Sequence, residues 1–211
     1  MSNTNRLAAM TRLIPRIVRP GTAPSVELVP GHLEIILVLE GTAGTRPVTY
    51  EDLERWDATI EELVPVAREN LRRRTGSDGW FPVKSAPGLM IYEASDGEAA
   101  SRMLLIDHLL QPTPIGGVIV AVPGEGQLMA VSLDEMDALE SLRVLASASE
   151  VVAKNEGVPL SDQLFWWDGS GWHLLAVERD NNEIRVHPSS GFLTMLERLA
   201  SMNYYAVAAE A

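Results

Sequence analysis

Apolar residues in several stretches of the chain follow the patterns of β-strands. HLEIILVLEG, at residues 32–41, is a run of β-branched and leucine residues between two glycines, which predicts a strand buried on both faces. SVELV, at 25–29, is its predicted partner across the Pro30-Gly31 turn. GLMIYEA, GVIVAV and QLMAV also predict strands, and the last two are expected to pair antiparallel across the turn at 123–126.

Four predicted helices begin with a hydroxyl residue that is followed three positions later by an acidic residue, the signature of a capping box. The four pairs are Thr49 with Asp52, Thr59 with Glu62, Ser95 with Glu98, and Ser132 with Glu135. The second helix carries apolar side chains at helical spacing up to Leu71. The fourth is expected to run for about twenty residues, and FLTMLERLASM predicts a last, short helix.

Strand pairs joined by tight turns, together with helices joined by longer connections, predict an α+β fold. We expect a mainly antiparallel sheet with helices packed on it, in a single compact domain. Residues 1–24 are predicted to form a basic N-terminal arm or helix that ends at Pro15 and Pro20, and residues 25–211 to form the α+β domain. The arm is basic because four arginines precede the first acidic residue, Glu27.

Composition and charge narrow the possible functions. Of 211 residues, 46% are hydrophobic and 22% are charged, which is typical of a soluble globular protein. The formal net charge of −12 disfavours binding to nucleic acid or to anionic membranes, because contacts with phosphate need a basic surface. The chain contains no cysteine, which excludes disulfides and a cysteine nucleophile, and a core without disulfides suits the cytoplasm.

Motifs of known chemistry are missing from the sequence. The four histidines, at positions 32, 108, 173 and 187, have no recognised metal-ligand spacing. The sequence also lacks a G-x-S-x-G elbow, a phosphate-binding loop with its lysine, and a dinucleotide fingerprint. We therefore predict no catalytic residue, metal or cofactor, although a serine or carboxylate site assembled across the fold would leave no local signature.

Arg68 and the run Arg72-Arg73-Arg74 allow two interpretations. They could form a phosphate-binding patch, or they could be cations placed at a helix C-terminus, where they complement the helix dipole. The second interpretation is favoured because Glu61 and Glu62 stand at the other end of the same predicted helix.

The segment QLFWWDGSGWHLLAVERDNNEIRVH, residues 163–187, predicts two consecutive hairpins. In the first, Trp167 should oppose Trp172 and Trp166 should oppose His173. In the second, a turn at 180–182 would place Leu175 opposite His187. One face would then be core, formed by Phe165, Trp167, Trp172, Leu174, Ala176, Ile184 and Val186. The other would carry Trp166, His173, Arg185 and His187, beside Arg179 and Glu183.

That second face has two possible roles. It could be the solvent side of the sheet, or it could bind a protein partner, since tryptophan and arginine dominate binding hot spots. A slip of one residue in the register would exchange the two faces.

Several stretches, in order, resemble the YtpQ-like family of bacterial proteins, a domain of unknown function. They are LIPRIVRP, HLEIILVLE with DLERWDATIEEL, ARENLRRR, YEASDGEAASRMLL, GVIVAVPGEGQLMAV and PLSDQLFWWDGSGW, which together span roughly residues 13–177. The resemblance implies no particular activity. It does suggest a possible family motif, Asp96, Gly97 and Arg102. A structural interpretation is favoured, in which Asp96 and Gly97 form the first turn of a capped helix and the acid complements the helix dipole.

Two classes of function follow from the sequence. The favoured one is a non-catalytic protein-binding or regulatory module, adaptor-like or immunity-like, whose acidic surface suits a basic protein partner. The alternative is a small-molecule hydrolase or transferase with a carboxylate or serine site.

Overall fold

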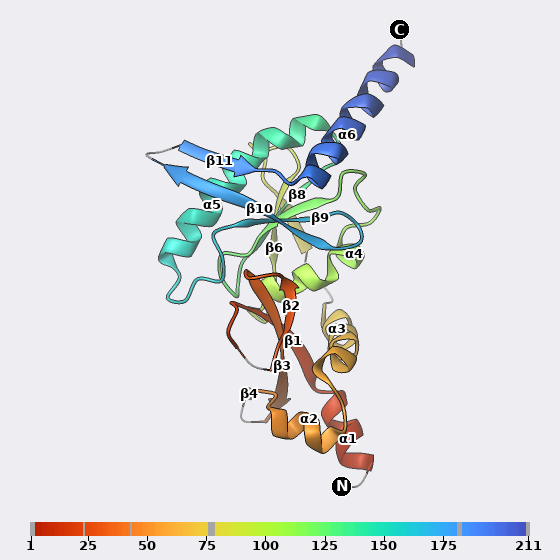
Figure 1. The fold of residues 1–211 in the computed structure, drawn as a ribbon, viewed down its shortest axis with the longest axis vertical. Helices are drawn as coiled ribbons and strands as arrows, with labels where there is room; N and C mark the ends of the chain where they lie inside the picture. Colours follow the sequence, from red (N-terminus) through yellow and green to blue (C-terminus); the bar gives the residue numbers. More distant parts are fainter. Residues whose placement is uncertain (1–2, 23, 43, 76–78, 181–182, 210–211) are drawn as a thin grey trace.

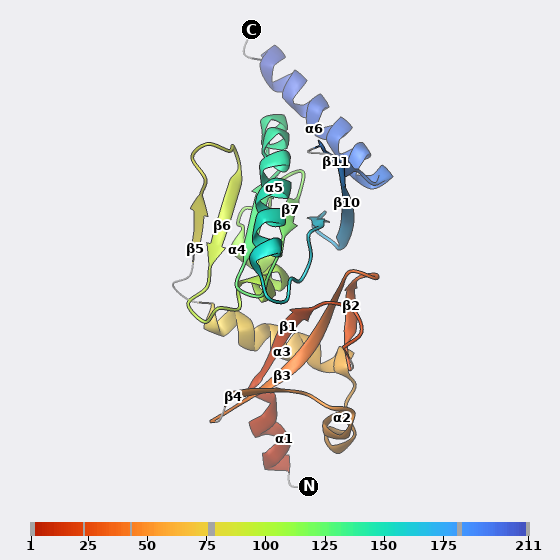
Figure 2. The ribbon, with the colours of Figure 1, turned by 90° about the vertical axis from the view of Figure 1, so that its left-hand side faces the viewer.

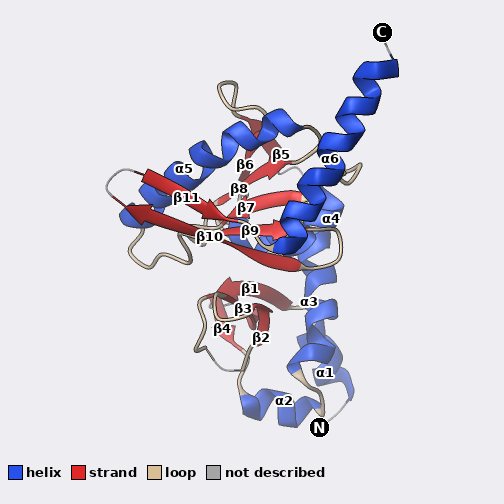
Figure 3. Cartoon of the chain, turned by 45° about the horizontal axis from the view of Figure 1, so that its top comes forward, coloured by secondary structure: helices blue, strands red, loops and turns tan. Residues whose placement is uncertain are grey.

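The computed structural model describes residues 3–22, 24–42, 44–75, 79–180 and 183–209, with side chains for all of these except 3–5 and 203–209. Six α-helices, two 3-10 helices and eleven strands form in these residues. The strands build two sheets, and every strand pair is antiparallel (Figures 1 and 3). We refer to residues 3–75 as the N-terminal lobe and to residues 79–209 as the C-terminal lobe.

The N-terminal lobe contains a four-stranded sheet built around one long strand. The strands are β1 (Leu13–Val18), β2 (Val26–Val29), β3 (Leu33–Gly41) and β4 (Gly44–Pro47), and β1, β2 and β4 all pair with β3. Residues on both faces of β3 are buried, as its apolar run predicts. On one face Leu37 packs in a cluster with Leu53 and Trp56. On the other face Ile36 packs with Leu71 and Leu105.

Two helices with confirmed capping boxes follow the first sheet. In α2 (Tyr50–Trp56), Thr49 Oγ1 accepts from the Asp52 N–H, and the Thr49 N–H donates to Asp52. In α3 (Ile60–Arg74), Thr59 and Glu62 do the same. Each reciprocal pair satisfies two N–H groups that a helix start otherwise leaves open, which fixes both helix starts locally.

Residues 3–18 do not form a separate basic arm. The helix α1 (Asn3–Met10) ends before Pro15, and residues 13–18 form β1, whose Leu13 pairs with Leu39 and whose Val18 pairs with Glu34. The prediction that a helix would continue to the prolines is therefore wrong. Pro15 is tolerated because β1 lies at the edge of its sheet, where one side of the strand needs no partner.

The C-terminal lobe contains a seven-stranded sheet in the order β11-β10-β9-β7-β8-β6-β5 (Figure 3). Its strands are β5 (Gly79–Pro82), β6 (Leu89–Glu93), β7 (Val118–Ala121), β8 (Leu128–Ser132), β9 (Leu164–Trp167), β10 (Trp172–Asp180) and β11 (Glu183–His187). The predicted hairpin of GVIVAV and QLMAV is the β7–β8 pair. The central strands β7 and β9 are buried at every position.

Both faces of this sheet are covered (Figures 1 and 2). On one face lie η2 (Met136–Glu140), α5 (Ser141–Asn155) and α6 (Ser190–Ala209), whose Leu145 and Phe192 pack with Ile119. On the other lie η1 (Ala99–Leu105) and α4 (Ile106–Leu109), and the N-terminal lobe follows beyond them. The last helix is longer than FLTMLERLASM predicts and projects away from the body of the molecule (Figure 1).

Two of the four predicted capping boxes do not form. Neither Glu98, before η1, nor Glu135, before η2, caps its helix through a side-chain hydrogen bond. Instead, the Glu98 side chain binds Arg16, and Ser132 Oγ donates to Asp134 at 2.8 Å. Alternative partners for these polar groups therefore outweigh the local pattern in both places.

One hydrophobic cluster joins the two sheets. It contains Ile17 and Ile35 of the first sheet together with Val120 and Phe165 of the second. The chain is therefore a single compact α+β domain with mainly antiparallel strands, as predicted, although it has two sheets. None of the described helices is long and apolar enough to cross a membrane.

Gly117 gives a test of the contact between β7 and β9. Its φ is +80°, and an added Cβ would lie 2.1 Å from the backbone oxygen of Trp167. Gly117→Ala should lower the free energy of unfolding by about 3 kcal/mol or more, because backbone cannot yield as a flexible side chain can. Urea denaturation measures this. Gly157→Ala is the control, since its Cβ would meet nothing within 4 Å; equal losses would contradict the assigned contact.

Candidate functional site

The first tryptophan hairpin has the predicted register but not the predicted exposure. Trp172 pairs with Trp167, and His173 pairs with Trp166. Trp166 is only 5% exposed, however, and its Nε1 donates to the Gly116 oxygen at 2.9 Å. Its ring also packs edge-on against Phe192 of α6. The prediction of an exposed Trp166 is therefore wrong. The helix α6 covers this face, and the sequence pattern predicts that helix without showing where it packs.

The second hairpin is shifted by one residue from the predicted register. Ala176 pairs with His187, and Glu178 pairs with Arg185. Because side chains alternate along a strand, Arg185 and His187 lie on the opposite face from His173. Ile184 and Val186 move to the face of Trp166, where they pack into the core.

The four predicted partner-binding residues, Trp166, His173, Arg185 and His187, therefore do not form one surface. Arg185 binds the neighbouring Glu183 at 2.7 Å, and His187 lies 3.0 Å from Glu178. The first contact is an ion pair within the edge strand β11, and the second is a hydrogen bond between β11 and β10.

Asp168 gathers several polar groups at the turn of the first hairpin. Its Oδ1 accepts from Ser170 Oγ at 2.8 Å and from the Ser170 and Gly171 N–H groups, and its Oδ2 lies 2.9 Å from His173 Nε2. Burial alone would raise the pKa of Asp168, but these hydrogen bonds outweigh it and hold the pKa below its usual range.

This arrangement does not activate a nucleophile. In a catalytic triad the histidine accepts the serine proton, and the carboxylate orients the histidine. Here the carboxylate lies between the two, and Ser170 donates to Asp168. The adjoining cavity, of about 260 Å³, is lined by Trp166 and Arg198, among others.

The possible family motif lies where the two lobes meet. Arg102 is 1% exposed, and its guanidinium binds Asp96 at 2.8 Å and the Glu98 oxygen at 3.1 Å. Gly97 has a φ of +76°, which a turn before η1 requires. Burial alone would raise the pKa of Asp96, but the hydrogen bonds from Arg102 and the Glu98 N–H hold it below its usual value.

Next to this motif, Glu98 binds Arg16 of β1, and Ser101 Oγ accepts from the Ile17 N–H at 3.4 Å. Burial and the nearby Glu125 carboxylate raise the pKa of Glu98, against the opposing effect of Arg16. These contacts attach η1 to the first sheet, which supports a structural role for the motif.

Acidic side chains of the same chain form ion pairs with the arginines at the end of α3. Arg72 and Arg73 both bind Glu69, Arg74 binds Glu40, and Arg68 binds Asp107 at 2.5 Å. This pairing supports the helix-terminus interpretation over a phosphate-binding patch.

Comparison with known proteins adds no further constraint. No protein-family model, curated protein or solved structure matches this chain. The resemblance to the YtpQ-like family therefore stays a prediction. Among the described residues, no group of three or more histidine or acidic side chains is placed to hold a metal ion.

The feature best suited to bind another molecule is a groove of about 900 Å³ between α2 and α3, which we call the acidic groove. Its residues come mainly from the end of α2 and the start of α3, the two helices whose starts the capping boxes fix (Figure 2). Its lining includes the acidic residues Glu54, Asp57, Glu61 and Glu62, the apolar residues Leu53, Ala58 and Ile60, and Tyr50.

The electrostatics of the acidic groove favour a cation. No arginine, lysine or histidine in the described part of the chain lines it, and Glu54, Asp57 and Glu61 make no ion pair with any described residue. Tyr50 is 62% exposed beside the carboxylates. Sequence reasoning missed this site because it assigned the acids at the start of α3 to helix capping and to the helix dipole. Only the turn at Asp57 brings the end of α2 beside them.

Asp52 holds the groove's first helix in place. Hydrogen bonds from Arg46, at 2.5 and 3.0 Å, and from Thr49 lower the pKa of Asp52 from 3.8 to about 2. A lowered pKa stabilises the folded state above the unfolded value, and this stability is lost as the pH falls from about 4 to 2.

Asp52→Asn should therefore lower the free energy of unfolding at pH 7 by about 1 to 2 kcal/mol, a value reduced because Arg46 is half exposed. The difference from the unsubstituted protein should vanish as the pH falls to 2. Denaturation at several pH values checks this, and a pH-independent difference would contradict the assigned ion pair.

The buried position of Trp166 gives a second prediction. Trp166→Ala and Trp167→Ala should each lower the free energy of unfolding by about 3 to 5 kcal/mol, because both remove a large core side chain. Thermal or urea denaturation measures both. A nearly neutral Trp166→Ala would instead restore the exposed face predicted from sequence.

Proposed function

We propose that this protein is a non-catalytic protein-binding module, adaptor-like or immunity-like, that receives a basic segment of a protein partner in the acidic groove. One observation carries the proposal: the described residues that line the 900 Å³ groove include four acidic side chains and no cationic one. The enzyme alternative has weaker support, because Ser170 donates to Asp168 and the imidazole of His173 is not placed to take its proton.

The chemistry of the groove fits lysine or arginine side chains. Leu53 and Ile60 supply an apolar floor for the aliphatic stems, and the carboxylates of Glu54 and Glu61 can meet the charged ends. Tyr50 offers a large aromatic surface of the kind that dominates binding hot spots. Charge complementarity of this type speeds association and excludes acidic partners.

The distribution of charge over the sequence also supports selectivity. Residues 1–77 contain ten arginines and ten acidic side chains, so residues 78–211 carry the whole net charge of −12. A basic partner is therefore attracted by the C-terminal lobe at long range and is bound by the groove at short range. Nucleic acid is disfavoured as a partner by the same field, and we place the protein in the cytoplasm because its core contains no cysteine.

The proposal is tested with a fluorescent peptide of alternating lysine and leucine residues. Fluorescence anisotropy should show binding that weakens with salt, and the double variant Glu54→Lys/Glu61→Lys should weaken it by about tenfold or more. A peptide of alternating glutamate and leucine should not bind.

The matched control is Glu135→Lys/Glu197→Lys, which changes the net charge equally at exposed acids of the C-terminal lobe. It should retain most of the binding. Equal losses in the two double variants would show that net charge alone is responsible, and the groove would be excluded as the site. In extracts of the native host, a true partner should be retained by the control and lost by the groove variant.

A further inference from the structure

The outer face of α5 carries apolar side chains that no described element covers. Val144 is 44% exposed and Val151 is 60% exposed, and they lie seven residues apart on one side of the helix. Figure 2 shows α5 in front of the sheet, with its outer face toward the viewer. Single exposed valines are common on protein surfaces, and it is the spacing of these two and the charges around them that distinguish this helix face.

The residues along α5 are arranged symmetrically about its middle. Ser147 and Ala148 are small and stand at the centre, with Val144 on one side and Val151 at the same separation on the other. Small central residues allow two helices to approach closely.

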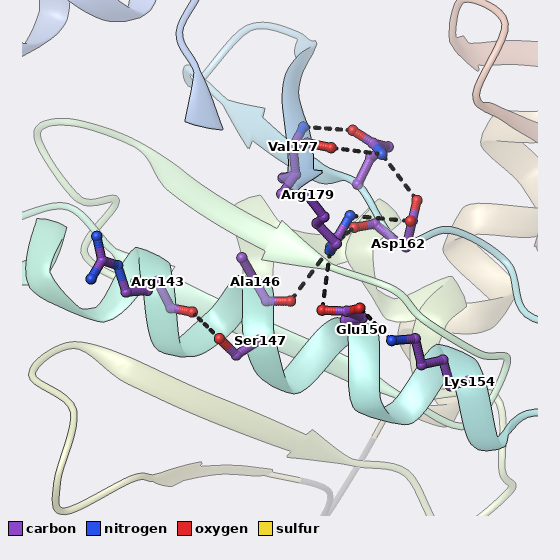
Figure 4. Close-up of polar contacts among 9 residues, drawn as sticks. Arg143, Ala146, Ser147, Glu150, Lys154, Asp162, Val177 and Arg179 are labelled. Atoms are coloured by element: carbon purple, nitrogen blue, oxygen red, sulfur yellow. Dashed lines mark hydrogen bonds and ion pairs between the residues drawn. The ribbon is translucent and has the colours of Figure 1, made fainter. Parts of the chain in front are cut away.

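The charged residues follow the same symmetry. Glu140 and Lys154 lie on opposite sides of the centre, within one residue of equal separation, and Arg143 and Glu150 do so within two residues. Figure 4 shows Arg143, Ser147, Glu150 and Lys154 following one another along the helix.

We propose that α5 is a self-association surface that pairs antiparallel with α5 of a second copy of this chain. A two-fold axis at Ser147 and Ala148 brings Val144 of each copy against Val151 of the other. The same axis brings Glu140 beside Lys154, and Arg143 beside Glu150, of the other copy. A parallel pairing would place each charge against its own kind, which is unfavourable.

Two of the four charged groups have no competing ion pair, and the other two already belong to a network that they would extend. Arg143 has no ion pair with any described residue, and neither has Glu140. Glu150 binds Lys154 at 2.5 Å and Arg179 at 3.4 Å, and Arg179 also holds the Asp162 side chain at 3.1 Å (Figure 4). This network fixes α5 on β10, so the face that it presents is rigid before association.

The size of the contact sets the expected strength. A helix of fifteen residues is about 22 Å long, and two such helices bury roughly 1,000 Å² or less in total. This area is below that of a standard stable interface, so the dimer should be weak and should depend on concentration. This surface lies in the C-terminal lobe, apart from the acidic groove, and the inference does not depend on the proposed function.

Sedimentation velocity across a wide concentration range tests the proposal. The unsubstituted protein should show a growing dimer fraction, and Val151→Glu should weaken association by more than about tenfold, because a charge would enter an apolar contact. Val66→Glu, at a valine that is 38% exposed on α3, is the matched control and should behave as the unsubstituted protein. A monomer at every concentration, or unchanged dimerisation of Val151→Glu, would overturn the proposal.

Charge exchange and cross-linking test the orientation. Glu140→Lys and Lys154→Glu should each weaken the dimer, and the double variant should recover it. Because the chain contains no cysteine, single introduced cysteines report proximity without background. A mixture of Glu140→Cys and Lys154→Cys should form a mixed disulfide, whereas preferential cross-linking of Glu140→Cys with itself would overturn the antiparallel arrangement.

Discussion

The structure depends on the burial of β7 and β9 on both faces. Every residue of VIVA at 118–121 and of LFWW at 164–167 is buried, so each face of the sheet needs its own cover. The helices α5 and α6 supply one cover, and η1 with the first sheet supplies the other. An apolar strand pair exposed to water on either side would forfeit much of the hydrophobic stabilisation of the core, which is why the two lobes cannot separate without loss.

The junction between the lobes adds polar contacts to this apolar base. Arg102, a buried residue of η1, is bound by Asp96, and Arg16 of β1 is bound by Glu98. A buried guanidinium is costly unless its hydrogen bonds are satisfied, so these pairs restrict which arrangement of the lobes is tolerated more than they add stability. The same demand explains why Asp96 and Glu98 serve the arginines and do not cap the helix that follows them.

Features set by neighbouring residues could be predicted from the sequence, and features set by distant ones could not. The capping boxes at Thr49 and Thr59 and the register of Trp166 with His173 depend on residues a few positions apart. The burial of Trp166 depends on Phe192 and Gly116, which lie far away in sequence. The register of the second hairpin could not be predicted for a different reason. A change of one residue in the length of its turn moves every side chain of the following strand to the other face of the sheet, and the sequence DNNE is compatible with either length.

The two binding surfaces have different consequences when they are considered together. The acidic groove lies at the far end of the N-terminal lobe and the α5 face lies in the C-terminal lobe, so the two share no residue (Figures 1 and 2). An antiparallel α5 pair would therefore carry two open grooves. A single shallow groove that binds through exposed charges gives modest affinity, because water and salt screen each contact. A partner with two basic segments would bind the pair far more tightly than one groove allows, provided that its linker spans the distance, whereas a partner with one segment would gain nothing. Self-association would thus select for the number of basic segments in a partner, which the charge of the groove cannot do alone.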